Sequence, residues 1–363
     1  MPVSIIDSRD EIAKLDKSNM IGSIEALGHQ IEHAWEDLKK IKFTSKNEIR
    51  NVVVAGMGGS ALGADVILHL FKEELTVPLY INKTYFLPNF VDEHTLVVLS
   101  SYSGTTEEVL AAATEAESRN AQIMVICAGG ALLELAQAKG YTHFVIDPVH
   151  NPSNQPRMAI GYSVFGTIGL LEKAGLLSIS DADVAAVVAT IHKQVEACTV
   201  EVLGESNPAK VLAYLMIDHQ PVITAAEFLE GAAHVSANQH NENGKVYVNY
   251  KVVPEINHHL MEGLRFPKSN ASTHFFVFVT SVLYPPKISL RMKLTQQIVE
   301  SNEIHTTAVP LQAASKLEQV FEMISLFSFC SFYLAMLEGI DPSPIPFVDE
   351  FKDELKKLSQ EYS

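Results

Sequence analysis

Short apolar runs alternate with stretches of helical spacing along most of this chain, and this rhythm is the feature that most constrains its fold. Runs such as NVVVAG, TLVVLSS and QIMVICAG are separated by helix-like segments such as TTEEVLAAATEAESRN. Such alternation indicates βαβ units and a parallel sheet that is buried on both faces. We therefore predict an α/β protein in which mostly parallel sheets lie between layers of helices.

The rhythm changes at several points, and these points suggest the domain organisation. The segment DPVHNPSNQP at 147–156 is rich in proline and asparagine, so it is expected to leave the first domain as a loop. A second α/β rhythm begins near QPVITAAEFL and includes KVYVNY (245–250) as a strand-like run. We predict four parts: a helical segment at 1–45, a first α/β domain at 46–150, a helical connection at 151–205, and a second domain with C-terminal helices at 206–363.

The amino-acid composition limits the kinds of partner that this protein is expected to bind. The chain has 27 Lys and Arg against 43 Asp and Glu, a formal charge of −16, and no basic block, which disfavours nucleic acid and an anionic membrane surface. The N-terminal residues do not resemble a signal peptide. No run of eighteen uninterrupted apolar residues, as a membrane-spanning helix would need, is found. The three cysteines are far apart in sequence, which fits a reducing cytoplasm.

A glycine-rich turn follows the first apolar run, in VVVAGMGGSALGAD (52–65). Gly56, Gly58 and Gly59 would let the backbone approach a ligand at a helix N-terminus, where an anion is favoured. The pattern is compatible with a dinucleotide-binding turn, but the next strand ends in Asn82 and Lys83 rather than in an acid that could bind a ribose. A tight strand-to-helix turn without a ligand is the alternative.

A second loop, SSYSGTTEEV at 100–109, places Ser101, Ser103 and Thr106 between a buried strand and a helix. One interpretation is a capping box, in which a Ser or Thr side chain caps the helix. Three hydroxyls at a helix N-terminus also suit a phosphate dianion, since each supplies a donor. Two such loops at the carboxyl ends of neighbouring parallel strands would lie where open α/β sheets bind ligands.

These loops resemble those of a known family. S-Y-S-G-T-T resembles the phosphosugar-binding signature S-x-S-G-x-T of the sugar isomerase (SIS) domain, and GMGGSALGAD resembles the first loop of the bifunctional phosphoglucose/phosphomannose isomerases. The resemblance implies two SIS-type domains and a hexose 6-phosphate substrate, with no cofactor and no metal. The residues that it assigns to substrate binding are Gly58, Gly59, Ser60, Ser101, Ser103 and Thr106.

Four further segments resemble the same family and carry its catalytic residues. QPRMAIGYSVFG implies a catalytic arginine at Arg157, and NQHNENGK implies the catalytic base at Glu242. PEINHH implies a ring-opening histidine at His258, and the C-terminal segment GIDPSPIPFVDEFKDELKK implies an active-site lysine at Lys352. The chain departs from the family just before the base, where His234 and Ser236 replace basic residues.

The chemistry of these residue types suits aldose–ketose isomerisation. One carboxylate can move a proton between adjacent carbons through a cis-enediol, and an arginine can stabilise the charge that develops on oxygen. The amides of Gln239, Asn241 and Asn243 could orient Glu242. The nearby histidines could instead suggest a metal site, but their spacing matches no standard ligand set.

We expect interconversion of glucose 6-phosphate and fructose 6-phosphate, and of mannose 6-phosphate as well. The resemblance also implies a homodimer whose sites are shared, with His258 of one chain meeting Glu242 of the other. The alternatives are a phosphosugar-binding SIS-domain protein that has no activity, as a regulator, or has a different specificity, and a nicotinamide-dependent enzyme.

Overall fold

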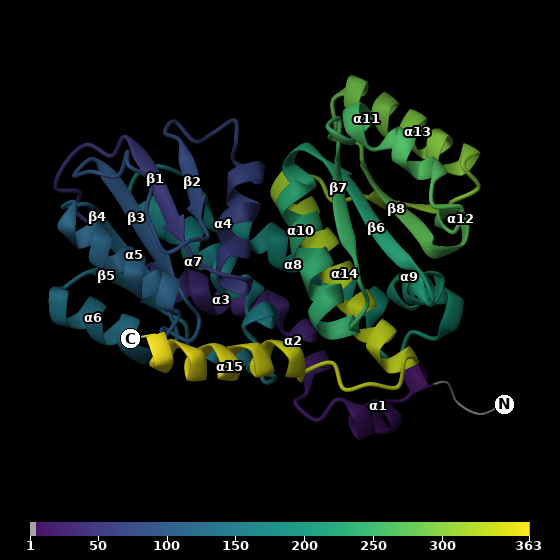
Figure 1. Ribbon diagram of the computed structural model, residues 1–363, viewed down its shortest axis with the longest axis horizontal. Helices are drawn as coiled ribbons and strands as arrows, with labels where there is room; N and C mark the ends of the chain where they lie inside the picture. Colours follow the sequence, from purple (N-terminus) through teal and green to yellow (C-terminus); the bar gives the residue numbers. More distant parts are fainter. Residues whose placement is uncertain (1–4, 363) are drawn as a thin grey trace.

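The computed structural model describes residues 5–362, and side chains up to residue 358. Its first sheet has five parallel strands in the order β2-β1-β3-β4-β5 (Figure 1). The strands are β1 (Asn51–Ala55), β2 (Leu79–Asn82), β3 (Thr95–Ser100), β4 (Gln122–Cys127) and β5 (Thr142–Val145). Every residue of β3 and β4 is buried, as the continuous apolar runs predict for a parallel sheet covered on both faces.

Helices cover both faces of this sheet. Val52 and Val54 of β1 belong to one apolar core, while Val53 and Ala55 belong to the other, because successive side chains of a strand point to opposite faces. The three helices that follow β1, β3 and β4 are α4 (Gly59–Leu70), α5 (Glu107–Ser118) and α6 (Gly130–Lys139). The predicted α/β fold with helical layers on both sides of a parallel sheet is confirmed.

The second sheet has four parallel strands in the order β7-β6-β8-β9. They are β6 (Gln220–Ala226), β7 (Asn249–Val253), β8 (His274–Ser281) and β9 (His305–Leu311). The helices and helical turns of this half are η5 (Glu227–Leu229), α10 (Glu230–Gln239), η6 (His240–Gly244), α11 (Ile256–His259), η7 (Met261–Arg265), α12 (Asn270–Thr273) and α13 (Pro286–Ser301). The two sheets share one strand order, since β7-β6-β8-β9 repeats the arrangement of β2-β1-β3-β4.

One predicted strand lies later in the sequence than expected. Residues 245–248 of the run KVYVNY form a loop, and β7 begins only at Asn249. Lys245 adopts a left-handed conformation (φ 54°), which interrupts any extended segment. The side chain of Asn241 then holds the loop by accepting from the N–H of Val248 and donating to its carbonyl.

Helices also begin, connect and close the chain. The first segment contains η1 (Ile5–Asp7), α1 (Arg9–Leu15), α2 (Met20–Glu25) and α3 (Leu27–Leu38). Between the sheets lie η2 (Pro148–His150), η3 (Pro156–Met158), α7 (Ile160–Lys173), α8 (Asp181–Cys198), η4 (Gly204–Ser206) and α9 (Pro208–Met216). The last helices are α14 (Lys316–Leu337) and α15 (Pro346–Tyr362). Helix α14 is long and apolar enough to cross a membrane, but 94% of its apolar stretch is buried, so it is the central core helix of the second half.

The two halves meet through α4 and α10. Gly231 of α10 lies so close to Val66 that a Cβ on this glycine would come within 2.5 Å of the Cα of Val66. One turn further along α10, His234 pairs with the carboxylate of Asp65 and stacks on Tyr250. This pairing lowers the pKa of Asp65 against the opposing effect of burial, so the contact between the halves includes an ionised carboxylate.

Candidate active site

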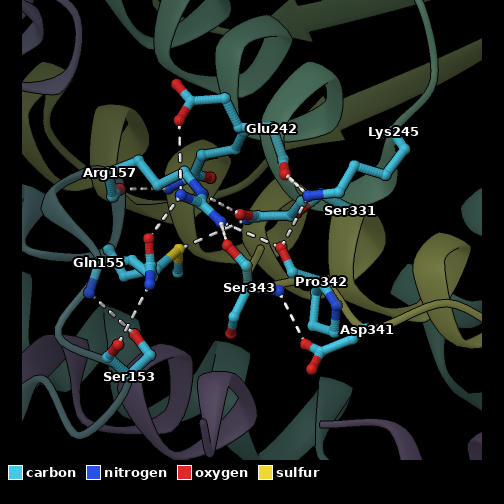
Figure 2. A network of polar contacts seen from close by, with 12 residues as sticks. Ser153, Gln155, Arg157, Glu242, Lys245, Ser331, Asp341, Pro342 and Ser343 are labelled. Carbon is cyan, nitrogen blue, oxygen red and sulfur yellow. Dashed lines mark hydrogen bonds and ion pairs between the residues drawn. The ribbon is translucent and has the colours of Figure 1, made fainter. Parts of the chain in front are cut away.

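The guanidinium of Arg157 is the centre of a polar network between the two halves (Figure 2). Arg157 is only 2% exposed. Burial lowers its pKa, and the charge of Glu242 opposes this effect, so the group remains charged at neutral pH. Its nitrogens donate to Asn243 Oδ1 (2.5 Å), Gln155 Oε1 (2.8 Å), Glu242 Oε2 (3.4 Å) and the carbonyl oxygens of Pro342 (3.0 Å) and Ser343 (2.8 Å).

The backbone around Arg157 is held as firmly as its side chain. Gln239 donates to the Arg157 carbonyl at 3.2 Å, and Ser328 of α14 fixes the amide of Gln239 in turn. A Cβ on Gly59 would lie 3.3 Å from the N and Cα of Arg157. The arginine therefore directly adjoins the glycine turn that follows β1.

Glu242 lies in η6, a five-residue π-helix that extends α10. Single π-turns of this kind occur frequently at functional sites. The Glu242 side chain is 33% exposed, and among the described residues Arg157 is the partner of its carboxylate. A buried arginine beside a solvent-accessible carboxylate can stabilise negative charge while the carboxylate takes or returns a proton.

The amides beside Glu242 do not orient its carboxylate, contrary to our prediction. Asn243 binds Arg157, Gln239 binds the Arg157 carbonyl, and Asn241 donates to the carbonyls of Ala237 and Val248. Asn241 and Asn243 are adjacent to Glu242 in sequence, so they point to different sides of the helix and do not face its carboxylate. Gln239 is three residues away, but its amide is held by the Arg157 carbonyl and by Ser328 instead.

Lys245 belongs to this network, although the sequence analysis assigned it no role. Its ammonium donates to the Pro342 carbonyl at 3.1 Å and to the carbonyl of Glu242 (Figure 2). Burial and the charge of Arg157 lower the pKa of Lys245 to about 8, against the opposing effects of Glu242 and Asp341. The signal available in the sequence was its place three residues after Glu242 in NENGK.

The predicted phosphate loop joins β3 to α5. Ser101 is buried and its hydroxyl lies 2.8 Å from that of Thr106, whereas Ser103 is exposed and accepts from the N–H and hydroxyl of Thr105. Thr106 occupies the N-cap of α5 but makes no side-chain capping hydrogen bond, so the capping-box interpretation does not hold for it. Gly104 has φ 68°, and a Cβ there would lie 1.8 Å from the Gly129 carbonyl, so the loop requires glycine.

Hydrogen bonds connect the two predicted ligand-binding loops to the Arg157 segment. Ser60 accepts from the N–H of Tyr102, and Gly59, Ser60 and Tyr102 line a small cavity with Pro156. The Tyr102 hydroxyl donates to Asn154 and accepts from Asn151, which also donates to the Gln155 carbonyl. Gly58 follows β1 with φ 50° and has open space where a Cβ would point. The two predicted ligand-binding loops and the Arg157–Glu242 pair thus form one continuous region.

Within one chain, His258 is far from this region. Helix α10 returns from the carboxyl end of β6 to the start of β7, so Glu242 lies near the amino ends of the strands. His258 follows the carboxyl end of β7 in α11, at the opposite end of the sheet (Figure 1). Five residues of β7 separate the two ends by about 16 Å.

Lys352 is also outside the network. It lies in α15, where residues 346–358 are all exposed, and its ammonium has no hydrogen-bond or ion-pair partner among the described residues. Ser343, which binds Arg157, precedes α15 by three residues. Lys352 therefore lies on an exposed helix that begins shortly after the segment bound by Arg157.

The histidines near Glu242 have other partners. His234 pairs with Asp65, while His240 is fully buried and contacts the Ser236 carbonyl and the Cys330 sulfur. Within residues 5–358, no group of three or more His, Cys, Asp or Glu side chains could hold a metal ion. The hydroxyl of Ser236 donates to the Ala232 carbonyl, so both positions that depart from the family pattern contribute to the packing of α10.

A larger cavity, of about 230 Å³, lies at the carboxyl ends of β8 and β9 and contains none of the predicted site residues. Its lining includes Ser281, Tyr284, Lys293 and Gln312. The candidate site is therefore defined by the polar network and not by this larger cavity.

Comparison with known proteins agrees with this geometry. Residues 47–145 match the model of the SIS domain, and residues 205–355 match that of the bacterial phospho-glucose isomerase C-terminal SIS domain. A hypothetical protein from Thermus thermophilus has a similar structure, with a TM-score of 0.71 and 19% identity over 93% of this chain and 90% of that one. This likeness supports the fold.

Two curated relatives extend the similarity over nearly the whole sequence. The bifunctional phosphoglucose/phosphomannose isomerase of Caldicellulosiruptor bescii is 32% identical over 93% of this chain and 99% of its own length. The protein of the same name from Aquifex aeolicus is 27% identical over 92% of this chain and 97% of its own length. The matched regions include both sheets, the hydroxyl loop and the Arg157–Glu242 pair, and the chain therefore belongs to the family of bifunctional phosphoglucose/phosphomannose isomerases.

Proposed function

We propose that this protein interconverts glucose 6-phosphate and fructose 6-phosphate, and mannose 6-phosphate and fructose 6-phosphate, through a cis-enediol intermediate. The observation that carries the proposal is the Arg157–Glu242 pair, in which a buried arginine lies 3.4 Å from an accessible carboxylate. Glu242 would take the proton from C2 of the aldose and return it to C1, and Arg157 would stabilise the enediolate oxygen.

The phosphate is assigned to the loop after β3. Ser101, Ser103 and Thr106 supply hydroxyls there, and the N-terminus of α5 adds its N–H groups and dipole. Gly58, Gly59 and Ser60 would lie along the sugar, because Gly59 adjoins the backbone of Arg157. A hexose phosphate bound in this way would extend from the hydroxyl loop toward Glu242.

Ring opening requires a proton donor and acceptor near neutral pH, which suits His258. Since His258 and Glu242 lie at opposite ends of the second sheet in one chain, we assign this role to His258 of a second copy. The enzyme would then be a homodimer with two shared sites, and two-fold dimers are the most common oligomers. Lys352 of α15 would complete the site as its active-site lysine.

The setting that we propose is cytoplasmic carbohydrate metabolism, in glycolysis and gluconeogenesis, without a cofactor. The three buried free cysteines support a reducing compartment. A regulator that only binds phosphosugars would need the hydroxyl loop but not the buried Arg157 network. The test is a coupled assay of the purified protein with glucose 6-phosphate and mannose 6-phosphate: binding of both without turnover of either would favour the regulator.

A further inference from the structure

Helix α15 exposes an apolar stripe that the described part of the chain does not cover. Residues 346–358 are all exposed, and Phe347 and Phe351 are 84% and 65% exposed. Phe347, Val348, Phe351 and Leu358 lie within about 100° of arc on one side of the helix, which is the width of a stripe that normally faces a core. Helices in proteins gain most of their stability from packing an amphipathic face, so this exposed stripe calls for a partner.

Helix α13 has a second stripe of the same kind. One side of α13 is buried against the sheet through Ile288, Met292 and Val299. Its outer side carries Leu290, Leu294 and Ile298 at a spacing of four residues, with Leu290 57% exposed and Leu294 48% exposed. This stripe is about 12 Å long, against about 16 Å for the stripe of α15.

The charges beside the two stripes are opposite. In the first half of α15, Glu350 and Glu354 lie along one edge of the stripe, against Lys352 along the other edge. In the first half of α13, Lys287 and Arg291 lie beside the stripe. A roughly parallel pairing would place the acidic half of one helix beside the basic half of the other. The two helices lie at opposite corners of the molecule in Figure 1, so one chain cannot pair its own α15 with its own α13.

We propose that α15 of each chain docks on the outer face of α13 of a second copy, and that this reciprocal contact covers the exposed stripe of the helix that bears Lys352. The inference rests in part on the proposed shared site. Asn257, next to His258, donates to Thr295 of α13 at 2.7 Å, so α11 and α13 move together. A second copy that brings His258 to Glu242 therefore brings α13 to the place where α15 leaves the Arg157 network.

The first test is disulfide cross-linking between chains of different mass. One chain carries Phe351→Cys and the other carries Leu294→Cys, and the three native cysteines do not compete because they are buried. We expect oxidation to produce the mixed cross-linked dimer in good yield. The control replaces Leu294→Cys by Thr114→Cys, an exposed position on α5, and should give little product. Equal yields from the two pairs would overturn the proposal.

The second test measures the dimer dissociation constant by sedimentation. Leu294→Asp should raise it at least tenfold, whereas Leu203→Asp, the same change at another exposed leucine, should leave it near the wild-type value. An unchanged constant for Leu294→Asp, or α15-dependent binding to phospholipid vesicles in place of dimerisation, would contradict the docking. Because neither test reads activity, cross-linking of a protein without isomerase activity would keep the docking and reject the proposed function.

Discussion

Arg157 and Glu242 lie 85 positions apart in sequence, yet Nη1 of the arginine is 3.4 Å from Oε2 of the glutamate. The arginine is buried while the carboxylate remains a third exposed. This asymmetry suits a fixed positive charge beside a group that exchanges protons with a substrate.

Replacing the proposed base should abolish turnover while leaving binding intact. We expect Glu242→Gln to lower kcat on the order of 10²–10⁴-fold, because the amide keeps the shape but cannot accept the proton. Rates from the coupled assay and substrate binding by calorimetry measure the two effects separately. Glu134→Gln, at an exposed position of α6, is the matched control. Near-wild-type turnover of Glu242→Gln would reject the assignment.

Removing one hydroxyl from the loop after β3 should weaken substrate binding. Ser103→Ala deletes an exposed hydroxyl, and losing a hydrogen bond to a charged group costs roughly 1.5–3 kcal/mol, or about 10–100-fold in KM. Steady-state kinetics measure the change, with Ser118→Ala as a control on another exposed serine. An unchanged KM together with a lower melting temperature would show that Ser103 stabilises the loop and does not bind the substrate.

Mixing two inactive variants tests whether the site is shared. Chains with Glu242→Gln are combined with chains with His258→Ala under conditions of subunit exchange. Each mixed dimer then has one site with both changes and one site with neither, so about a quarter of the wild-type activity should return at equal concentrations. If exchange is demonstrated by mass and no activity returns, each chain uses its own histidine.

Lys245 is expected to position the base through the backbone. Its ammonium joins the carbonyls of Glu242 and Pro342, and Arg157 binds the latter carbonyl as well. Lys245→Met should lower kcat about tenfold or more with a smaller change in KM, and Lys245→Arg should restore part of the rate because it keeps the donors. Lys46→Met, on the exposed surface, controls for the lost charge. Equal effects of the Met and Arg variants would contradict this role.

Acid should destabilise the fold through His240. Burial lowers the pKa of this histidine to about 4, while the unfolded chain keeps a value near 6.5. Between these values the unfolded state binds a proton that the folded state does not, so stability is full above pH 6.5 and falls as the pH decreases. At pH 5 the loss from this group is about 2 kcal/mol.

Urea unfolding at pH 7 and pH 5 measures this contribution. The drop in unfolding free energy should be smaller by about 2 kcal/mol in His240→Gln than in the wild type, because glutamine does not titrate. An identical drop in the two proteins would show that His240 is already protonated or accessible in the folded state.

The sequence by itself determined the local elements and the chemical types at the site. Alternating apolar runs report which residues are buried along a strand or helix, so the parallel strands and most helices could be predicted, as could Arg157 and Glu242 from their motifs. The start of β7 was misplaced because the left-handed Lys245 and the Asn241 side chain, not hydrophobicity, decide where that strand begins. The boundaries at 45, 150 and 205 and the roles of the site residues stay predictions.

Tertiary structure alone decided which groups meet. The carbonyls of Pro342 and Ser343 reach Arg157 across 185 and 186 positions, and no periodicity in the sequence encodes such a contact. It depends on how α10 packs on α4 through Gly231, which sets the position of the second half against the first. The parallel pairing of β7 with β6 places His258 at the far end of the sheet from Glu242, because α10 must return to the amino end of β7 before the chain crosses the sheet again. Side-chain periods report burial within an element and do not specify how elements pair.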